Sequence, residues 1–419
     1  GEKNLVWRIV QDHVEKDLMF LGTEFGVYFT VDGGAHWTEM NGGIPTISFR
    51  DLAIQRREKD LVAASFGRGF YILDDYTALR SVNKEQLQEP ASLFEPRKAW
   101  WYMEKSVLDF DDVRGSQGSQ LFVAPNPDFG AVLTYYLKEE VKSLEQVRKD
   151  LEDSLATNLS FPGWAALEEE TREMKPYVYL EIQDTEGRVV NRVKAENKPG
   201  FNRVAWNLRV GGSGTLMLDG KEQLLTAMLA APGDYTATLH AFEKGKSIRL
   251  AGPVDVKVER LGEPALPGKP MEEVVAFWRK YEQLTRDVNT LSVQLSNARK
   301  ASSRLFQAAS SSAVGGEVLE RIAALQAGLD ALDTQLNGNP AKNEIGEKGK
   351  PTIGSRLFAL NRGISTSTYG PTPTHLETVG IITSEWQSMN DKLMRLKGEA
   401  KEIGALIVKS GGPWVEGLD

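Results

Sequence analysis

The spacing of apolar residues changes along this chain, and the changes divide it into three regions. Over residues 1–105, apolar and polar positions alternate in short runs separated by polar or glycine-containing turns. Alternation with a period of two is typical of half-buried β-strands. It predicts six short strands, at residues 6–10, 18–22, 27–31, 50–54, 61–65 and 70–73.

The second region, residues 106–265, has a β pattern that is interrupted by a charged segment at about 138–173. We expect that segment to be a helical insertion. After it, residues 177–182 and 189–193 alternate on either side of a polar turn, which predicts a hairpin.

Two further segments of the second region carry a resemblance. Residues 198–208, Lys-Pro-Gly-Phe-Asn-Arg-Val-Ala-Trp-Asn-Leu, and 231–239, Ala-Pro-Gly-Asp-Tyr-Thr-Ala-Thr-Leu, resemble strands of immunoglobulin-like sandwiches in secreted bacterial proteins. The resemblance implies a β-sandwich with Trp206 and Tyr235 in its core.

The third region, residues 266–419, has apolar residues at alternating steps of three and four. This period of 3.5 predicts long helices that pack at shallow angles. The three long rows are Val274, Phe277, Tyr281, Leu284, Val288, Leu291, Leu295; Val318, Ile322, Leu325, Leu329, Leu332, Leu336; and Ile382, Trp386, Met389, Leu393, Leu396, Ala400, Ile403, Ile407. A shorter row is Ile353, Leu357 and Leu360. We therefore expect an antiparallel bundle of three long helices and one short helix.

One segment of the first region matches a known motif at every defined position. Residues 30–37, Thr-Val-Asp-Gly-Gly-Ala-His-Trp, fit the Asp-box pattern Ser/Thr-x-Asp-x-Gly-x-x-Trp that begins with Thr30. Asp32 can accept hydrogen bonds from its own turn, Gly33 and Gly34 can adopt positive φ, and Trp37 can wedge between sheets. In sialidase-like and sortilin-like propellers, which this segment resembles, the Asp-box lies on the outer rim. The motif therefore predicts a β-propeller blade and no catalysis.

A second segment resembles the closing segment of large bacterial Asp-box (BNR-repeat) proteins. It contains Gly67, Arg68 and Gly69, followed by an aromatic strand that ends in Asp74 and Asp75. About two blades cannot close a propeller, which needs roughly 4 to 8. We therefore expect the remaining blades upstream in the same polypeptide or in a partner chain.

Two connecting segments follow these blades. Ala-Trp-Trp-Tyr at residues 99–102 is either a last strand of the final blade or a packing strap, and residues 109–120 predict a linker or a surface loop. Together, the final blades of a propeller, the sandwich and the helical bundle resemble the C-terminal part of large secreted BNR-repeat proteins that are labelled glycosyl hydrolase or sortilin-like. That resemblance implies a secreted, periplasmic or cell-surface location and protein partners in a larger complex, with carbohydrate as a further candidate ligand.

Composition narrows the function classes. The chain has 419 residues, a net charge of −8 and no cysteine. The absence of cysteine excludes disulfides, thiolate catalysis and cysteine-bound metals. The net negative charge argues against a general nucleic-acid-binding function. No stretch reaches the roughly 18 apolar residues of a transmembrane helix.

Candidate chemistry in the sequence is sparse. His13, His36, His240 and His375 are far apart, with no metal-ligand spacing. The Gly67-Arg68-Gly69 segment lacks the Gly-Lys-Ser/Thr ending of a phosphate loop and predicts a hairpin turn instead. Calcium ligation by Asp109, Asp111 and Asp112 is disfavoured, because no EF-hand loop follows. We expect no metal, no cofactor and no catalytic residue in this chain.

Two hypotheses about function remain. Near the blade ends, the ionisable candidates are Arg50, Asp51, Arg68, Asp74 and Asp75, and turn or ion-pair roles are expected for most of them. A glycosidase needs two carboxylates at a defined separation. If the whole protein is a hydrolase, we expect most of that site to lie in blades outside this chain. The favoured hypothesis is a non-catalytic scaffold and interaction module. The alternative is the accessory region of a sialidase-like glycoside hydrolase.

Overall fold

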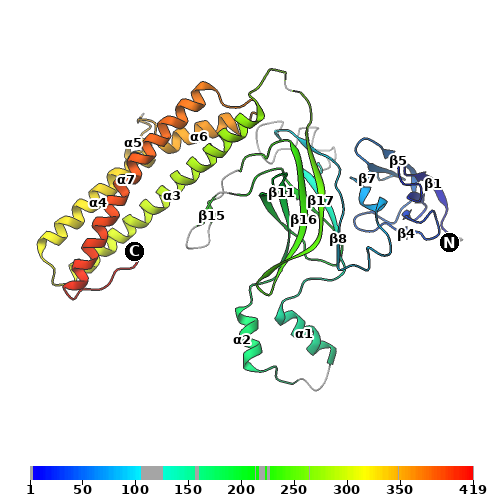
Figure 1. Cartoon of the computed structure of the whole chain (residues 1–419), viewed down its shortest axis with the longest axis horizontal. Coiled ribbons are helices and arrows are strands. Elements are labelled where there is room, and N and C mark those ends of the chain that lie inside the picture. The colour runs from blue at the N-terminus through cyan, green and yellow to red at the C-terminus, as the bar shows by residue number, and fades with distance from the viewer. Residues whose placement is uncertain are drawn as a thin grey trace. The chain divides into compact units, whose positions relative to one another are not determined.

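The computed structural model describes residues 3–104, 126–155, 160–212, 214–216, 222–223, 227–263, 265–347 and 349–418. The fold is mixed β plus α, with several antiparallel sheets and a C-terminal helical region (Figure 1). It divides into two compact units, one with almost all of the β structure and one with the C-terminal helices. We describe each unit by itself.

Two small antiparallel sheets begin the first unit. One has the order β1 (Val6–Gln11), β2 (Met19–Thr23), β3 (Gly26–Thr30), β4 (Thr38–Glu39), and the other β5 (Phe49–Gln55), β6 (Asp60–Ser65), β7 (Phe70–Leu73). These strands occur where the alternation predicts them. Both sheets share one core, made of Leu18, Phe20, Val27, Phe49, Leu52, Leu61, Ala63 and Tyr76. Gly22 allows the close approach, because a Cβ there would lie 2.7 Å from the Phe49 carbonyl oxygen.

Two larger sheets follow in the same unit. The three-stranded sheet has the order β13 (Gly200–Trp206), β10 (Ala131–Leu137), β8 (Ala91–Leu93). The five-stranded sheet has the order β12 (Val189–Ala195), β11 (Tyr177–Asp184), β16 (Gly233–Glu243), β17 (Lys246–Arg260), β9 (Ala99–Trp101). The Trp206 ring from one sheet meets the Tyr235 ring from the other edge to face, with centroids 5.0 Å apart. Trp206 is fully buried, so these two aromatic residues lie in the core between the sheets.

The position of β9 corrects a prediction. Its residues pair in parallel with Val258–Arg260 at the end of β17, and β8 pairs with β10. The interpretation of residues 99–102 as a last strand of the final blade is therefore wrong. The pairing partner of β9 lies far away in the sequence, where a local pattern cannot reveal it.

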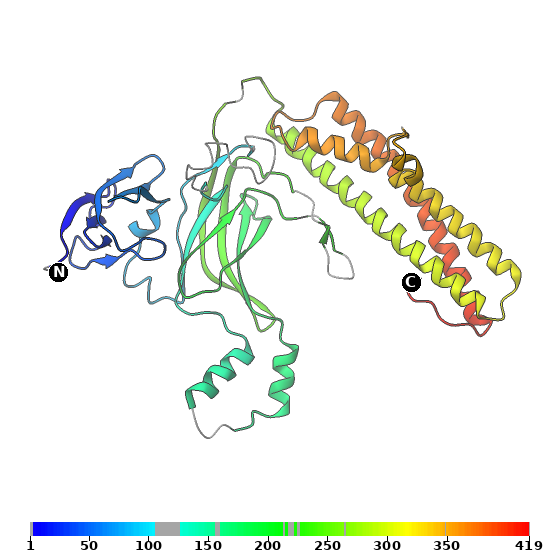
Figure 2. The same cartoon turned by 180° about the vertical axis from the view of Figure 1, so that it is seen from behind.

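A helical hairpin lies between β10 and β11, in the segment where the sequence predicts helices. It consists of α1 (Leu144–Leu155) and α2 (Trp164–Arg172), and neither helix has a buried residue. Figure 2 shows the hairpin from the second side.

The second unit contains the short strands β14 (Thr215–Leu216) and β15 (Glu222–Gln223) and the helices α3 (Met271–Ser310), α4 (Gly316–Asn337), α5 (Pro340–Glu344), α6 (Ile353–Ile364) and α7 (Pro373–Lys409). Every residue of the predicted apolar rows is buried except Trp386 and Leu396, which are half-buried. Among the described residues, no helix combines the length and apolarity needed to cross a bilayer.

Contacts between the long helices give their directions. Arg299 of α3 pairs with Asp330 and Asp333 of α4, and Arg321 of α4 pairs with Glu399 and Glu402 of α7. Contacts between α3 and α7 follow the chain in the same direction in both helices. Near the start of each helix the ring of Phe277 stacks on His375, and further along Lys397 donates a hydrogen bond to Gln294. Helices α3 and α7 are therefore parallel to each other, and α4 runs antiparallel to both: Gln326 contacts Ser302 where Asp333 contacts Arg299, and Gly328 lies beside Leu396 where Arg321 contacts Glu399. This up-down-up order is an antiparallel arrangement of three long helices.

Candidate functional site

The Asp-box segment forms a tight turn between β3 and β4. Asp32 Oδ1 accepts hydrogen bonds from Thr30 Oγ1 at 2.7 Å and from the His36 backbone N–H at 2.9 Å. Its Oδ2 lies 2.7 Å from His36 Nδ1. Gly33 and Gly34 have φ values of 69° and 97°. The backbone hydrogen bond from His36, with those from its ring and from Thr30, holds the pKa of Asp32 well below its usual range.

Trp37 completes this turn. It is half-buried, and its indole lies 3.6 Å from the position of a Cβ on Gly34, so the ring packs over the turn. The polar atoms of the motif bond to one another within the turn. The arrangement can stabilise a loop, and it directs no reactive group toward a cleft.

The segment around Arg68 connects β6 to β7 as a hairpin. Ser65 donates from its backbone N–H and its hydroxyl to the Gly69 carbonyl at 3.0 and 2.8 Å. Gly67 and Gly69 have positive φ, and the Arg68 side chain is exposed. A strand follows this turn, so it lacks the helix N-terminus of a phosphate loop.

Asp75 joins the N-terminal sheets to the larger sheets. Its backbone N–H donates to Asp60 at 2.9 Å, and its Oδ1 accepts from the Thr77 hydroxyl at 2.6 Å. Its Oδ2 accepts from the Arg97 backbone N–H at 3.2 Å, and its carbonyl accepts from Arg203 Nη2 at 2.7 Å. Arg97 Nη1 also lies 3.2 Å from Asp60 Oδ1. We call this cluster the Asp75 junction.

Asp74 lies beside the Asp75 junction. Burial, and then the negative charge of Asp60, raises the pKa of Asp74, and the charges of Arg97 and Arg203 oppose this. A raised carboxyl pKa suits a general acid, but Asp74 does not line the cleft described below. Its surroundings are those of an ion-pair network.

The other two charged candidates near the blade ends also have partners. Arg50 donates to Ser48 at 2.8 Å, and its guanidinium lies 3.6 Å from the centre of the Trp7 ring. Asp51 forms an exposed ion pair with Arg8 at 3.2 Å. Neither side chain converges with a second candidate.

Sequence reasoning missed a buried cluster of Asp12, Tyr76 and Arg80. The Asp12 side chain is fully buried, and Arg80 donates to its two oxygens with Nε and Nη2, each at 2.8 Å. The Tyr76 hydroxyl also donates to Asp12. Burial favours the neutral acid, but the hydrogen bonds from Arg80, Glu15 N–H and Tyr76 hold the pKa of Asp12 well below its usual range. Arg80 is 68 residues away, so no local pattern could have indicated this pair.

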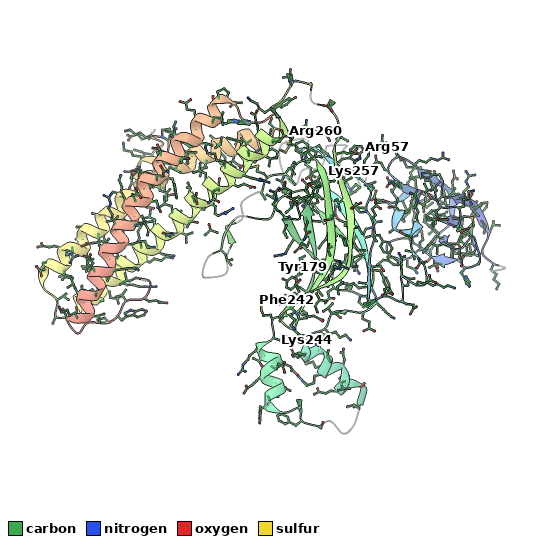
Figure 3. The ribbon with its side chains drawn as sticks, viewed as in Figure 1. Arg57, Tyr179, Phe242, Lys244, Lys257 and Arg260 are labelled. Atoms are coloured by element: carbon green, nitrogen blue, oxygen red, sulfur yellow. The ribbon has the colours of Figure 1, made fainter. Side chains whose placement is uncertain are left out.

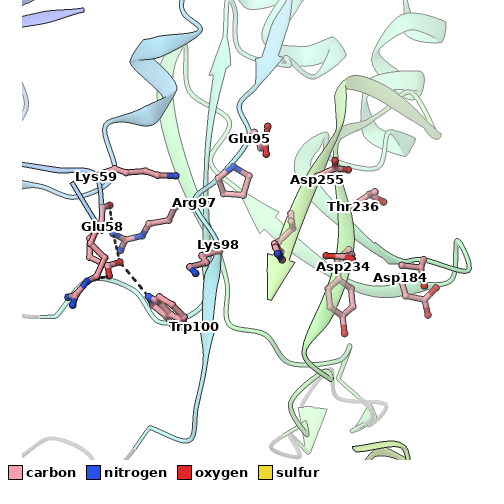
Figure 4. A pocket seen from close by; sticks show the side chains of 16 residues that line it. Glu58, Lys59, Glu95, Arg97, Lys98, Trp100, Asp184, Asp234, Thr236 and Asp255 are labelled. Atoms are coloured by element: carbon pink, nitrogen blue, oxygen red, sulfur yellow. Dashed lines mark hydrogen bonds and ion pairs between the residues drawn. The ribbon is translucent and has the colours of Figure 1, made fainter. Parts of the chain in front are cut away.

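The described residues of the first unit also form a cleft of about 680 Å³ (Figure 4). One wall is the turn at residues 57–59, between β5 and β6. The other wall carries Asp234, Thr236 and Asp255 from β16 and β17, and Trp100 of β9 lies between the walls. Figure 3 labels two cations of the lining, Arg57 and Lys257, near one end of the five-stranded sheet.

The two walls of this cleft differ in how their charges are used. Glu58 accepts from Trp100 Nε1 at 3.4 Å and pairs with Arg57 and Arg97. Within the described residues, the carboxylates of Asp234 and Asp255 have no hydrogen bond or ion pair. The cleft can therefore offer two free acceptors and an indole to a polar ligand.

Apolar side chains are exposed on the outermost strands of both small sheets. On β1, Val6 and Ile9 are 50% and 53% exposed, and on β7, Phe70 and Ile72 are 75% and 59% exposed. Both strands are sheet edges. These edges are the largest exposure of apolar β structure in the N-terminal sheets.

The four histidines considered for metal binding lie on different elements or turns of the described structure. Among the described residues, no three histidine or acidic side chains are grouped to hold a metal ion. His240 stacks on Tyr179, and His375 caps α7 with Thr372. Asp109, Asp111 and Asp112, and the predicted linker at 109–120, lie outside the described residues.

Comparisons with known proteins add little. No family model and no curated protein matches the chain. Two solved structures are similar: extracellular domains of BT4673 from B. thetaiotaomicron, one described as a putative one component system and one as a putative hybrid two component system. They are 11% and 12% identical, and each has a TM-score of 0.15. The alignments cover 62% and 61% of this chain but only 26% and 25% of those chains.

The chain thus spans about a quarter of the structures that it matches. A TM-score of this size carries no conclusion about fold or function. The resemblance to an Asp-box therefore remains a prediction from the sequence of residues 30–37.

Proposed function

We propose that this chain is a non-catalytic region of a secreted or cell-surface Asp-box propeller protein, where it acts as a scaffold and interaction module. In this proposal the two small sheets are propeller blades and the larger sheets form an immunoglobulin-like sandwich. The observation that carries the proposal is the exposed apolar edge on β1 and β7.

An exposed edge strand presents unpaired N–H and C=O groups, and proteins usually cover such strands. Phe70 and Ile72 alternate along β7 on one face, as expected for side chains that a neighbouring blade would bury. In this proposal, further blades from the same protein or from a partner chain cover β1 and β7.

The Asp75 junction supports a scaffold role. Two arginines outside the small sheets, Arg97 and Arg203, bond to a residue at the end of β7. A set of blades added at the edges would then be held on a support of larger sheets. The predicted catalytic groups of a hydrolase would lie in those added blades.

Single-cysteine labelling tests the proposal, since the chain has no native cysteine. A Phe70→Cys variant should react with a maleimide at least tenfold more slowly in the full-length parent protein than in this chain alone. A Phe358→Cys variant is the matched control, because Phe358 is 64% exposed on α6, and its rate should not change. Equal rates at Phe70→Cys in both proteins would refute the added blades. Glycan hydrolysis by this chain alone would contradict the non-catalytic role.

The cleft favours a second candidate, the accessory region of a sialidase-like glycoside hydrolase that contacts carbohydrate. An indole and two carboxylates that line the same cleft offer stacking and hydrogen bonds to a sugar. Trp100→Ala and Asp255→Asn should each weaken oligosaccharide binding at least tenfold in calorimetry. Trp414→Ala is the control, because Trp414 is 67% exposed outside the cleft. This candidate fails if no oligosaccharide binds, or if the control weakens binding equally.

A further inference from the structure

The helical hairpin of α1 and α2 has charged side chains between its helices. Arg148 of α1 donates to Glu170 of α2 at 2.7 and 3.0 Å, and to Glu152 of α1 at 2.8 Å. These three side chains are half-buried, whereas no residue of either helix is fully buried. Ion pairs therefore hold the two helices together, and the apolar side chains of the hairpin remain exposed and available to a binding partner.

The apolar side chains of α1 form a continuous exposed row. Val147, Leu151 and Leu155 follow one another at four-residue steps and are 53%, 58% and 52% exposed. Such spacing places them on one face of the helix, over about 12 Å at 1.5 Å per residue. We call these three residues the α1 stripe. Phe161 and Trp164, 61% and 75% exposed, form a second apolar pair with ring centroids 5.1 Å apart.

The charge of the hairpin is uncompensated and negative. Residues 138–173 contain ten acidic and five basic side chains. All five basic side chains are engaged: Lys138 with the Gln88 carbonyl, Lys142 with Asp150, Arg148 with Glu152 and Glu170, Lys149 with Glu145, and Arg172 with Glu168. Within the described residues, five carboxylates form no ion pair: Glu139, Glu140, Asp153, Glu169 and Glu173, of which Glu173 accepts a hydrogen bond from the Leu144 N–H at 2.8 Å.

We propose that the α1 stripe docks a basic amphipathic helix of a partner protein. A helix with leucine-type anchors at i, i+3 or i+4, and i+7 fits an exposed stripe of this spacing. Lysine or arginine on that helix would be attracted by the excess of negative charge in the hairpin, which favours this partner over an acidic or neutral one. The inference goes beyond the proposed function, because it needs no further blades and no propeller.

Charge also decides against two other occupants. An anionic lipid surface would be repelled by the net negative charge of the hairpin. A second copy of the hairpin would bring the same uncompensated charge to its partner, which disfavours pairing between copies. A basic protein helix is the occupant that gains both apolar contact and charge complementarity.

Fluorescence anisotropy with a synthetic peptide tests the proposal on the whole chain. The probe is a labelled helix of about 18 residues, five turns long, with leucine at heptad positions a and d and lysine or arginine elsewhere. We expect one peptide to bind per chain, with affinity that falls as salt is raised, because salt screens exposed charges. An analogue with glutamate in place of the basic residues should not bind.

Variants of the chain locate the site. Leu151→Ser should weaken binding at least tenfold, and Val147→Ser should do so independently. Leu376→Ser is the matched control, since Leu376 is 54% exposed on α7, and it should bind the peptide unchanged. Far-ultraviolet circular dichroism should show the same helix content in all variants, because every substituted side chain is exposed.

Four results would overturn the proposal. They are no binding of the basic peptide, equal binding of the acidic analogue, equal binding by the Leu151→Ser variant, and equal loss of binding by the Leu376→Ser control. Two further measurements test the other occupants. Binding to vesicles of phosphatidylcholine with phosphatidylglycerol tests a lipid surface, and sedimentation of the chain alone tests a second copy. Vesicle binding or self-association that Leu151→Ser abolishes would replace the partner helix by a lipid surface or by a second copy.

Discussion

Replacing Asp12 by asparagine should strongly destabilise the two small sheets. The change keeps the shape of the side chain but removes the charge that faces the Arg80 guanidinium and the Tyr76 hydroxyl. Arg80 would remain charged in a site where only 16% of its side chain is exposed. Its nearest acceptor would be one neutral amide oxygen.

The size of the effect follows from the burial of the two partners. Removing one member of a buried ion pair costs about 3–5 kcal/mol, because the other charge is left uncompensated. Arg80 retains some access to water, so we expect the lower end of that range, about 3 kcal/mol. The loss of this ion pair should also affect the core that the two small sheets share. The hydroxyl of Tyr76 bonds to Asp12, and its ring packs edge to face on Phe20 in that core, with centroids 5.2 Å apart.

Hydrogen exchange measured by mass spectrometry is the appropriate assay, because it reports each region separately. Protection of β2 and β3 should fall roughly a hundredfold in the Asp12→Asn variant, while the helices of the second unit should not change. Asp51→Asn is the matched control, since that carboxylate is 67% exposed in its pair with Arg8 and should contribute at most about 1 kcal/mol. If both variants lose equal protection, the reasoning about burial is wrong.

The same carboxyl predicts a pH dependence. Burial raises the pKa of Asp12, but the hydrogen bonds from Arg80, Glu15 and Tyr76 outweigh it and lower the folded-state pKa below the unfolded value of about 3.9. The stability that Asp12 contributes is therefore fully present above about pH 4, and it is lost as the pH falls through the folded pKa. The Asp12→Asn variant should lack this dependence on acid.

Three further variants test other parts of the structure. Gly130→Ala should cost about 3 kcal/mol or more and remove exchange protection from β10, because φ is 108° and a Cβ would collide with the Trp206 carbonyl oxygen. Glu282→Gln should raise the melting temperature of the second unit at pH 7 but not at pH 4. Burial raises the pKa of Glu282 despite the hydrogen bond from Met228 N–H, so stability is highest below about pH 4.3 and declines as the pH rises through the folded pKa. Asp32→Asn should speed exchange in the β3–β4 turn to the full extent above about pH 4, and this effect should fade as the pH falls through the lowered folded pKa of Asp32, because its hydrogen bonds favour the charged form. A uniform effect across pH would contradict the last two expectations.

Features set by neighbours in the sequence could be predicted. The heptad rows mark which face of each helix is buried, because residues three and four apart share a face; Ile322 and Leu329 are 0% and 1% exposed. The hydrogen bonds of the Asp-box span at most four residues, so the spacing of Thr30, Asp32 and His36 indicates them. Alternation likewise indicates the strands of the small sheets.

Features set by distant residues could not be predicted. Arg80 and Asp12 meet across 68 residues, and Lys98 and Glu259 across 161. The cleft also requires a turn at residues 57–59 to face β16 and β17. No periodicity carries such information, because tertiary packing brings these side chains together.

The pairing of β9 with the end of β17 has a consequence for synthesis of the chain. Lys98 leaves the ribosome 161 residues before Glu259, its partner across this pairing. At about 5–20 residues per second, that interval is roughly 10–30 s. During this time Trp100 and Trp101 belong to a strand whose pairing partner, the end of β17, has not yet been synthesised. Nascent chains that stop before Val258 should therefore expose two tryptophans, a surface suited to chaperone binding.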